Sequence, residues 1–294
     1  MYSALNGTTQ KGAITVIWRR LIGRVLHKEP GRRDGTNTAS PPTASAIRRD
    51  RVVILIAIVL ATVIAWSWLI NMARDMTSAP MMGMPAMDPW ALGNLISMVI
   101  MWVIMMVGMM LPSATPMILI YARVVRQKNT LSAARALTAS FTVGYLVMWA
   151  AFSVVATLLQ AALQDLDLIS SMLESTSSVL GGALFIAAGV YQLTPLKRAC
   201  LKGCRSPLDF VLHSWRKGRI GSLVMGLEHG VLCASCCWMM MMLLFVVGVM
   251  NLFWVAALTV LVLAEKALPA GEWTARIGGV SMLGAGIWLL SRSP

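Results

Sequence analysis

Long apolar runs separated by short polar segments dominate this chain. A helix needs about 20 apolar residues to cross the hydrocarbon core of a bilayer. The runs that approach this length are 52–72, 91–111, 137–160, 179–196, 221–247, 252–268 and 273–290. The fifth and sixth runs are separated only by a turn, which favours a tight helical hairpin. The pattern therefore predicts an all-α polytopic transmembrane helical bundle of about seven spans, with six as the alternative.

The polar connections between these runs carry charge unevenly. If the N-terminus is cytoplasmic, only Arg74 and Arg292 of the 25 Lys and Arg residues fall on the opposite side. Lys and Arg accumulate in cytoplasmic loops, so this arrangement predicts a cytoplasmic N-terminus. The chain then divides into a basic disordered cytoplasmic tail (1–50), a first transmembrane helix with a Met-rich extracytoplasmic loop (51–90) and a metal-binding helical membrane domain (91–294).

The composition agrees with a membrane protein and argues against a nucleic-acid-binding protein and against a secreted, disulfide-rich protein. The chain is 57% hydrophobic and 13% charged, whereas a soluble domain is about a quarter charged. The net charge of +13 comes from Lys and Arg residues in the predicted cytoplasmic segments, where they fix the orientation of the spans. We therefore expect the lipid bilayer, and no nucleic acid, as the partner of this chain. Five cysteines, three of them within one apolar run, do not fit a secreted disulfide framework.

The fifth run contains the segment "GLEHGVLCASCCWMMMMLLF" (226–245), in which ionisable and sulfur side chains replace aliphatic ones. Such residues inside a membrane span are costly and usually functional. At 100° per residue one stripe of the helix collects most of the donors. Its members are Met225, His229, Cys233, Cys236 and Met240, with Cys237 beside them. Imidazole, thiolate and thioether groups suit Cu(I) well and zinc less well.

Two other interpretations of this segment stay open. Cys233 and Cys236 form a C-x-x-C motif, which is typical of thiol–disulfide oxidoreductases when it stands at a helix N-terminus. An intramembrane oxidoreductase using this pair is therefore one alternative, although the motif lies in the middle of the span. The other alternative is a scaffold or assembly subunit without metal, in which Cys and Met only pack.

Methionines form two further groups. Met98, Met101, Met105 and Met109 recur every three or four residues in the second run, which places them on one helical face. A single helix seldom completes a metal site, so we expect this stripe to face the donors of the fifth run. The loop over residues 71–90 contains Met81–Met87 between prolines, and its thioethers are candidates for collecting or releasing copper outside.

Pro112 and Pro116 are expected to break or kink the second span.

Two smaller features lie near the cytoplasmic ends of the later runs. Cys200 and Cys204 follow the fourth run in a basic loop, where thiols four residues apart on a helix could hold one soft ion. Glu265 and Lys266 at the end of the sixth run are expected to pair at the membrane edge.

Four stretches together resemble a bacterial family of predicted metal-binding integral membrane proteins, a domain of unknown function. They are "MMVGMMLPSATPM" (105–117), "YQLTPLKRACLKGCRSP" (191–207), "GLEHGVLCASCCWMMMMLLFVVGVMNLFWVAALTVLVLAEKALPAG" (226–271) and "GVSMLGAGIWLL" (279–290). The resemblance extends over roughly residues 90–290. It implies a copper-chaperone-like protein of the bacterial inner membrane that supplies metal to copper enzymes.

The sequence therefore predicts a multi-pass membrane protein that binds Cu(I), is not an enzyme, and passes the ion to a copper-dependent enzyme or a periplasmic copper carrier. No ATP-binding P-loop motif is present, so we expect any transport to be passive, coupled or driven by exchange. The predicted metal residues are His229, Cys233, Cys236, Cys237, Met98, Met101, Met105, Met109, Met240, Cys200 and Cys204.

Overall fold

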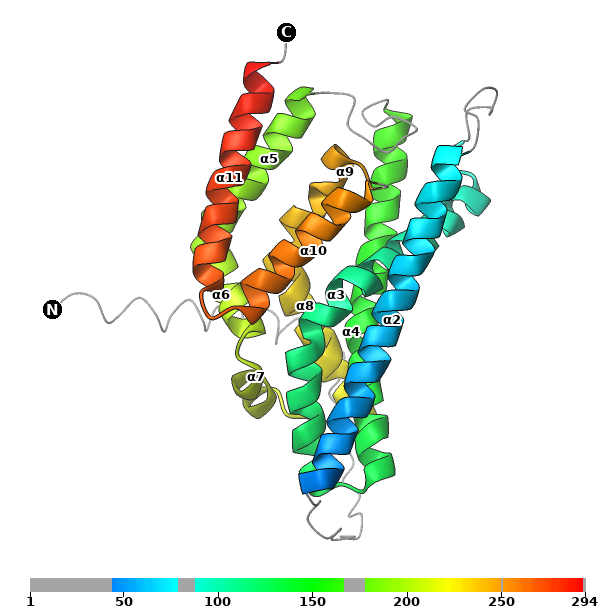
Figure 1. The fold of residues 1–294 in the computed structure, drawn as a ribbon, viewed down its shortest axis with the longest axis vertical. Helices are drawn as coiled ribbons and strands as arrows, with labels where there is room; N and C mark the ends of the chain where they lie inside the picture. Colours follow the sequence, from blue (N-terminus) through cyan, green and yellow to red (C-terminus); the bar gives the residue numbers. More distant parts are fainter. Residues whose placement is uncertain (1–43, 79–87, 167–177, 250, 293–294) are drawn as a thin grey trace, which may run out of the picture. The chain divides into compact units, whose positions relative to one another are not determined.

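The described part of the chain is predominantly helical, as the apolar pattern predicts. A computed structural model describes residues 44–78, 88–166, 178–249 and 251–292, and none of these lies in a strand. All of them belong to one unit, residues 40–294, drawn in Figure 1. The helices are α2 (Ala44–Ser78), α3 (Leu92–Lys128), α4 (Leu131–Asp165), α5 (Ser178–Leu193), α6 (Pro195–Cys204), α7 (Pro207–His213), α8 (Gly218–Met242), α9 (Leu244–Val247), α10 (Leu252–Ala267) and α11 (Gly271–Ser291).

Four helical segments in the described part are long and apolar enough to cross a membrane. They are Ile47–Asp75, Leu92–Lys128, Leu131–Asp165 and Gly218–Val247. A fifth candidate joins α5 to α6 across a bend of 66°. At about 1.5 Å per residue, the 16 residues of α10 reach only about 24 Å, less than the hydrocarbon core. α11 begins with the charged Glu272 and Arg276. The structure thus supports four or five spans, and the predicted seven, with a cytoplasmic N-terminus, stay predictions.

α3 continues through both prolines to Lys128, so Pro112 and Pro116 do not break the second span, and the kink stays a prediction. A proline has no backbone N–H, so Pro112 leaves the carbonyl four residues earlier without its helical donor. That carbonyl belongs to Gly108, and the indole Nε1 of Trp66 on α2 donates a hydrogen bond to it at 3.4 Å. A neighbouring helix therefore compensates for the proline, as membrane helices permit.

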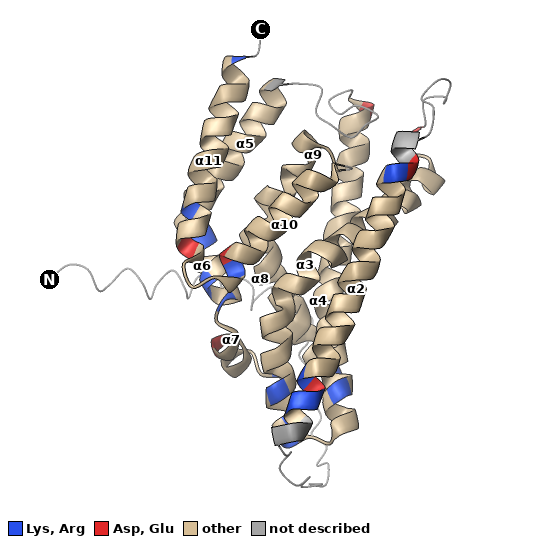
Figure 2. Ribbon diagram, viewed as in Figure 1, with Lys and Arg blue, Asp and Glu red and all other residues tan. Residues whose placement is uncertain are grey.

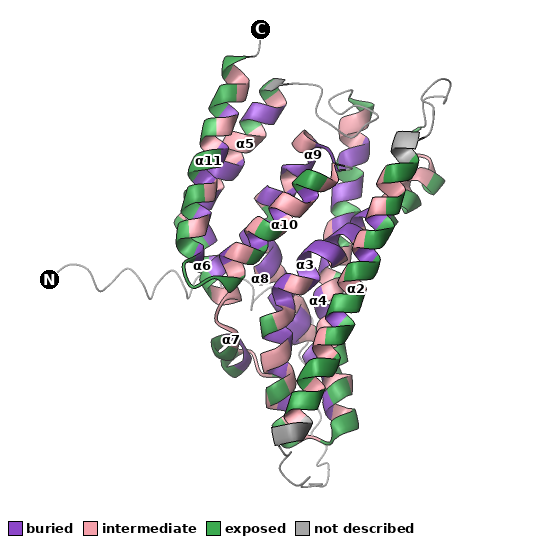
Figure 3. Cartoon of the chain, in the orientation of Figure 1, coloured by how far each residue is buried: buried purple, intermediate pink, exposed green. Residues whose placement is uncertain are grey.

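α8 packs on α4 through glycines at which the two backbones almost touch. A Cβ added at Gly226 would lie 1.9 Å from the Phe141 carbonyl oxygen, and one added at Gly144 would lie 2.0 Å from the Leu223 carbonyl oxygen. Small residues let membrane helices approach this closely. α8 has buried residues from Ser222 to Met241, whereas Figure 3 shows α2 exposed over much of its length. The helix that carries five of the eleven predicted donors therefore packs closely against a neighbour.

α5 and α11 form a second glycine-lined pair, and they run side by side in Figure 1. A Cβ at Gly189 would approach the Gly279 carbonyl oxygen to 2.8 Å, and one at Gly286 would approach the Gly182 carbonyl oxygen to 2.8 Å. α10 lies next to α11 and reaches α3. This arrangement brings the C-terminal end of α10 towards the interior face of α8.

Charged residues gather at the helix ends. Figure 2 shows Lys and Arg around the lower ends of α2, α3 and α4 and around α6, whereas little charge lies along the middle of the long helices. At one of these ends the Arg126 guanidinium bonds the Asp50 carboxylate at 3.1 Å. This distribution agrees with the uneven loop charges in the sequence.

Candidate metal centre

The predicted donors of α8 all face the interior. The imidazole of His229 is 3% exposed, and the side chains of Cys233, Cys236, Cys237 and Met240 are each 1% exposed. All five residues contribute to the buried face of α8. The helical projection therefore identified the face that the bundle encloses.

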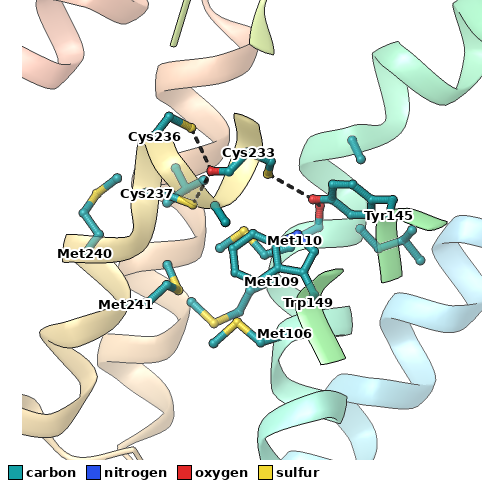
Figure 4. Close-up of a cluster of buried hydrophobic side chains, with 14 of the residues drawn as sticks. Met106, Met109, Met110, Tyr145, Trp149, Cys233, Cys236, Cys237, Met240 and Met241 are labelled. Carbon is teal, nitrogen blue, oxygen red and sulfur yellow. Dashed lines mark hydrogen bonds between the residues drawn. The ribbon is translucent and has the colours of Figure 1, made fainter. Parts of the chain in front are cut away.

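The Cys233 thiol has polar neighbours from two other helices, α10 and α4. The Lys266 ammonium of α10 lies 2.8 Å from Cys233 Sγ and 3.2 Å from the Ser113 hydroxyl of α3. The Tyr145 hydroxyl of α4 lies 3.1 Å from the same sulfur and also donates to the Met110 carbonyl at 3.0 Å. Figure 4 shows the tyrosine reaching across to this thiol. The Lys266 ammonium can donate to this sulfur, whereas the single proton of the Tyr145 hydroxyl is directed at the Met110 carbonyl, which leaves the phenol oxygen as an acceptor towards Cys233.

Cys236 joins the cysteines of α8 to the pair on α6, Cys200 and Cys204. Its Sγ lies 3.9 Å from Sγ of Cys204, at the end of α6. The thiols of Cys236 and Cys237 each donate to the Cys233 carbonyl at 3.0 Å (Figure 4). Cys200 lies one turn before Cys204 and is itself buried. All five cysteines are free thiols, so sulfur donors from α6 and α8 occupy one region.

His229 sits in an aromatic enclosure one turn before Cys233. Its ring centroid lies 6.1 Å from that of Phe141, 5.8 Å from that of Tyr145 and 5.4 Å from that of Phe210. The His229 Nδ1 atom is buried and has no hydrogen-bond partner. Buried polar atoms are nearly always paired, and an unpaired imidazole nitrogen is a good ligand for a soft ion.

Three of the four methionines in the α3 stripe are buried, Met98 is partly exposed, and the members have different neighbours. Met101 is 2% exposed, and Met105 and Met109 are each 1% exposed. In Figure 4, Met106, Met109 and Met110 project towards Met241 of α8. Met98, at the other end of the stripe, accepts a hydrogen bond at 3.7 Å from the amide of Gln160 on α4. The stripe therefore runs from the α4 side of the bundle to a thioether cluster beside α8.

A buried polar network adjoins Met240. The Gln192 amide of α5 donates to Met240 Sδ at 3.5 Å and to the Glu265 carboxylate of α10 at 2.7 Å. The Lys197 ammonium of α6 bonds the other Glu265 oxygen at 2.7 Å, with side-chain exposures of 1% and 2%. Glu265 and Lys266 therefore do not pair with each other as expected, because neighbouring helical residues do not face each other.

The structure places several of the predicted metal residues close to one another. Cys204 meets Cys236, and Cys233 lies one turn from both His229 and Cys237. In the described residues, no three His, Cys, Asp or Glu side chains are grouped so as to hold a metal ion. The predicted outer loop, Met81–Met87, lies outside the described residues.

Sequence reasoning missed three groups at this centre: Lys266, Tyr145 and Ser113. The only signal for Lys266 was its position near the end of an apolar run, where a charged residue is rare and often functional. Tyr145 and Ser113 occur in ordinary apolar helices and carry no such signal. The contact between Cys204 and Cys236 was missed because the two residues were assigned to separate sites.

Comparison with protein families relates the chain to a described family. A model of the PpoB2 family, described as a copper chaperone, matches residues 99–289. No curated protein and no solved structure matches the chain. The matched range includes α8, α6, α10 and the buried methionines of α3 from Met101 onward.

Proposed function

Because the chain belongs to the PpoB2 family of copper chaperones, we propose that it binds Cu(I) within a helical membrane bundle and passes the ion to a partner. The partner would be a copper-dependent enzyme or a periplasmic copper carrier, and the membrane a bacterial inner membrane. The apolar helices that are long enough to cross a bilayer and the buried sulfur donors support this proposal. Copper is the cargo in this function, and no catalytic role is assigned to the chain.

The contact between Cys204 and Cys236 carries the proposal. Two sulfur atoms bound to one soft ion at about 2.3 Å each lie about 3.8 to 4.6 Å apart, depending on the bond angle. The observed separation of 3.9 Å falls in this range. We therefore assign Cys204 and Cys236 as the primary ligand pair, with Cys233 and Cys237 as neighbouring thiols that could take over the ion.

The remaining donors suggest how the ion would move. His229 and Met240 lie on the same buried face of α8, one on each side of the cysteines in the sequence. The α3 stripe of Met98, Met101, Met105 and Met109 would offer weaker thioether sites on a route through the bundle. Cys200, one turn from Cys204, would be an exchange ligand at the α6 end.

Cu(I) fits this donor set better than zinc does. Structural zinc is almost always held by four ligands drawn from Cys, His and carboxylates. Two close thiols in a bundle that also buries several thioethers are a softer and less crowded set, which selects Cu(I). Low coordination also suits a carrier, because a free position lets an incoming ligand from the partner displace the ion.

Copper titration of the purified protein in detergent would test the assignment. The fully reduced wild-type protein should hold Cu(I) against a chromogenic Cu(I) chelator, and Cys204→Ser and Cys236→Ser should each lower the bound copper per chain. Met239→Leu changes a partly buried methionine of α8 that is not assigned as a ligand and provides the matched control. Zinc titrated in parallel should bind more weakly.

Two results would contradict the proposal. One is equal copper content in the wild type and in a Cys204→Ser/Cys236→Ser double variant that elutes as the same monodisperse species. The other is tighter binding of zinc than of Cu(I). Transfer from the loaded protein to a copper-free acceptor protein, followed by separation of the two, would test delivery.

A further inference from the structure

The Cys204–Cys236 pair has the placement of a redox-active thiol pair as well as that of a ligand pair. The two Sγ atoms are 3.9 Å apart, and a disulfide bond is about 2.05 Å long. Sulfur atoms move by several ångströms when χ1 changes rotamer, so the remaining gap of about 2 Å lies within side-chain reach. The Cys236 thiol would give up its hydrogen bond to the Cys233 carbonyl on the way.

The thiols of Cys233 and Cys237 have polar neighbours other than a second thiol. Cys233 Sγ has the Lys266 ammonium and the Tyr145 hydroxyl as neighbours, and Cys237 donates to the Cys233 carbonyl. The sulfur atom in contact with Cys236 is that of Cys204 on another helix, and not that of Cys233 in the C-x-x-C motif. A bond between Cys204 and Cys236 would therefore link α6 to α8.

We propose that Cys204 and Cys236 form a reversible interhelical disulfide that closes the copper site. The co-reactant is a small disulfide of the glutathione class. Cys204 is the more exposed of the two thiols, so its thiolate attacks the small disulfide, forms a mixed disulfide and releases one small thiol. Cys236 thiolate then attacks the Cys204 sulfur and releases the second small thiol.

The atoms and electrons of this exchange balance. The two protein thiols lose two electrons and two protons and gain one S–S bond, while the small disulfide gains the same electrons and protons and becomes two thiols. Excess small thiol reverses both steps. No metal and no further oxidant is needed.

The consequence for copper rests on the proposed function. The disulfide uses both sulfur atoms that the proposal assigns to Cu(I), and a disulfide sulfur is a far poorer ligand than a thiolate. The oxidised protein should therefore lose copper binding at this pair, and bound Cu(I) should in turn protect the pair from oxidation. Copper occupancy and thiol oxidation would exclude each other.

Peptide mapping under non-reducing conditions would test the disulfide. The full-length, metal-free protein in detergent is incubated with glutathione disulfide, and its remaining thiols are then alkylated. The expected product is a linked pair of peptides containing Cys204 and Cys236, which disappears after treatment with dithiothreitol. The link should be absent in Cys204→Ser and still form in Cys200→Ser, which removes the other thiol of α6.

Copper measurements on the same samples separate this proposal from the proposed function. Loss of Cu(I) binding in the cross-linked wild type, restored by dithiothreitol, is the expected result. Absence of the Cys204–Cys236 link, or a linked protein that keeps its full copper content, would overturn the redox proposal. Failure of the reduced protein to bind Cu(I) would overturn the proposed function instead, and the peptide map would still decide whether the disulfide forms.

Discussion

The Lys266 ammonium lies 2.8 Å from the Sγ of Cys233, which places a positive charge against the buried thiols of α8. Lys266 also interacts electrostatically with Cys236 and Cys237. One Cu(I) bound by two thiolates carries a net charge of minus one. An unpaired charge inside a bundle is costly, so Lys266 would offset the negative charge of the proposed copper site.

Replacing Lys266 by Met should therefore weaken Cu(I) binding. Met keeps most of the side-chain length and removes the charge, and we expect the affinity to fall by about tenfold, or about 1.4 kcal/mol. Lys266→Arg keeps the charge and should retain most of the affinity. Competition with a chromogenic Cu(I) chelator measures both variants, and unchanged affinity in Lys266→Met would show that the charge does not serve the site.

His229→Phe should have opposite effects on stability and on copper. A buried polar atom without a partner costs about 1–3 kcal/mol, and the unpaired Nδ1 of His229 is such an atom. Phe fits the aromatic enclosure, so the metal-free variant should resist unfolding at least as well as the wild type. Its Cu(I) affinity should nevertheless fall if the imidazole is a ligand. Denaturant unfolding of the metal-free form and chelator competition measure the two effects, and an unchanged affinity would leave His229 a packing residue.

Removing the Glu265 carboxylate should destabilise the bundle. Glu265→Gln leaves the Lys197 ammonium, which is 1% exposed, without its counter-charge, and breaking a buried ion pair costs about 3–5 kcal/mol. The double variant Glu265→Gln/Lys197→Met removes both charges and should regain part of this loss. Denaturant unfolding in detergent measures these differences. A single variant as stable as the wild type would mean that water reaches the pair.

Gly226→Ala should disrupt the α4–α8 contact. The added methyl group would lie 1.9 Å from the Phe141 carbonyl oxygen, so the two backbones would have to separate. Gly284→Ala is the matched control, because an added Cβ at this helical position meets nothing within 4 Å and alanine favours a helix by about 1 kcal/mol over glycine. Thermal unfolding should show a lower midpoint for Gly226→Ala and an equal or higher one for Gly284→Ala.

Much of the fold could be predicted because apolar length and helical periodicity are local properties. The stripe of His229, Cys233 and Cys236 follows from their spacing alone, and the structure buries that face of α8. The continuation of α3 past Pro112 could not be predicted in this way. The donor that compensates for the proline is the indole of Trp66, which lies 42 residues earlier than its acceptor Gly108.

The centre itself depends on contacts between distant parts of the chain. Cys204 and Cys236 are 32 residues apart, and nothing in their local sequence indicates that α6 turns back towards α8. Lys266 and Cys233 are 33 residues apart, and the lysine reaches the thiol only because α10 leads its C-terminal end inward. Spacing therefore identified the donors of each helix but not which donors from different helices meet.

The bend of 66° between α5 and α6 has a mechanical consequence. α6 is only 10 residues long, and its last residue supplies one of the two thiols in contact. Any bond across that contact, whether through a metal ion or between the sulfur atoms, ties this short helix to α8. If the pair is bridged as proposed, residues 195–204 would be held at α8 as well as at the Lys197–Glu265 ion pair, and the bridged and open states would differ in how firmly this short helix is fixed.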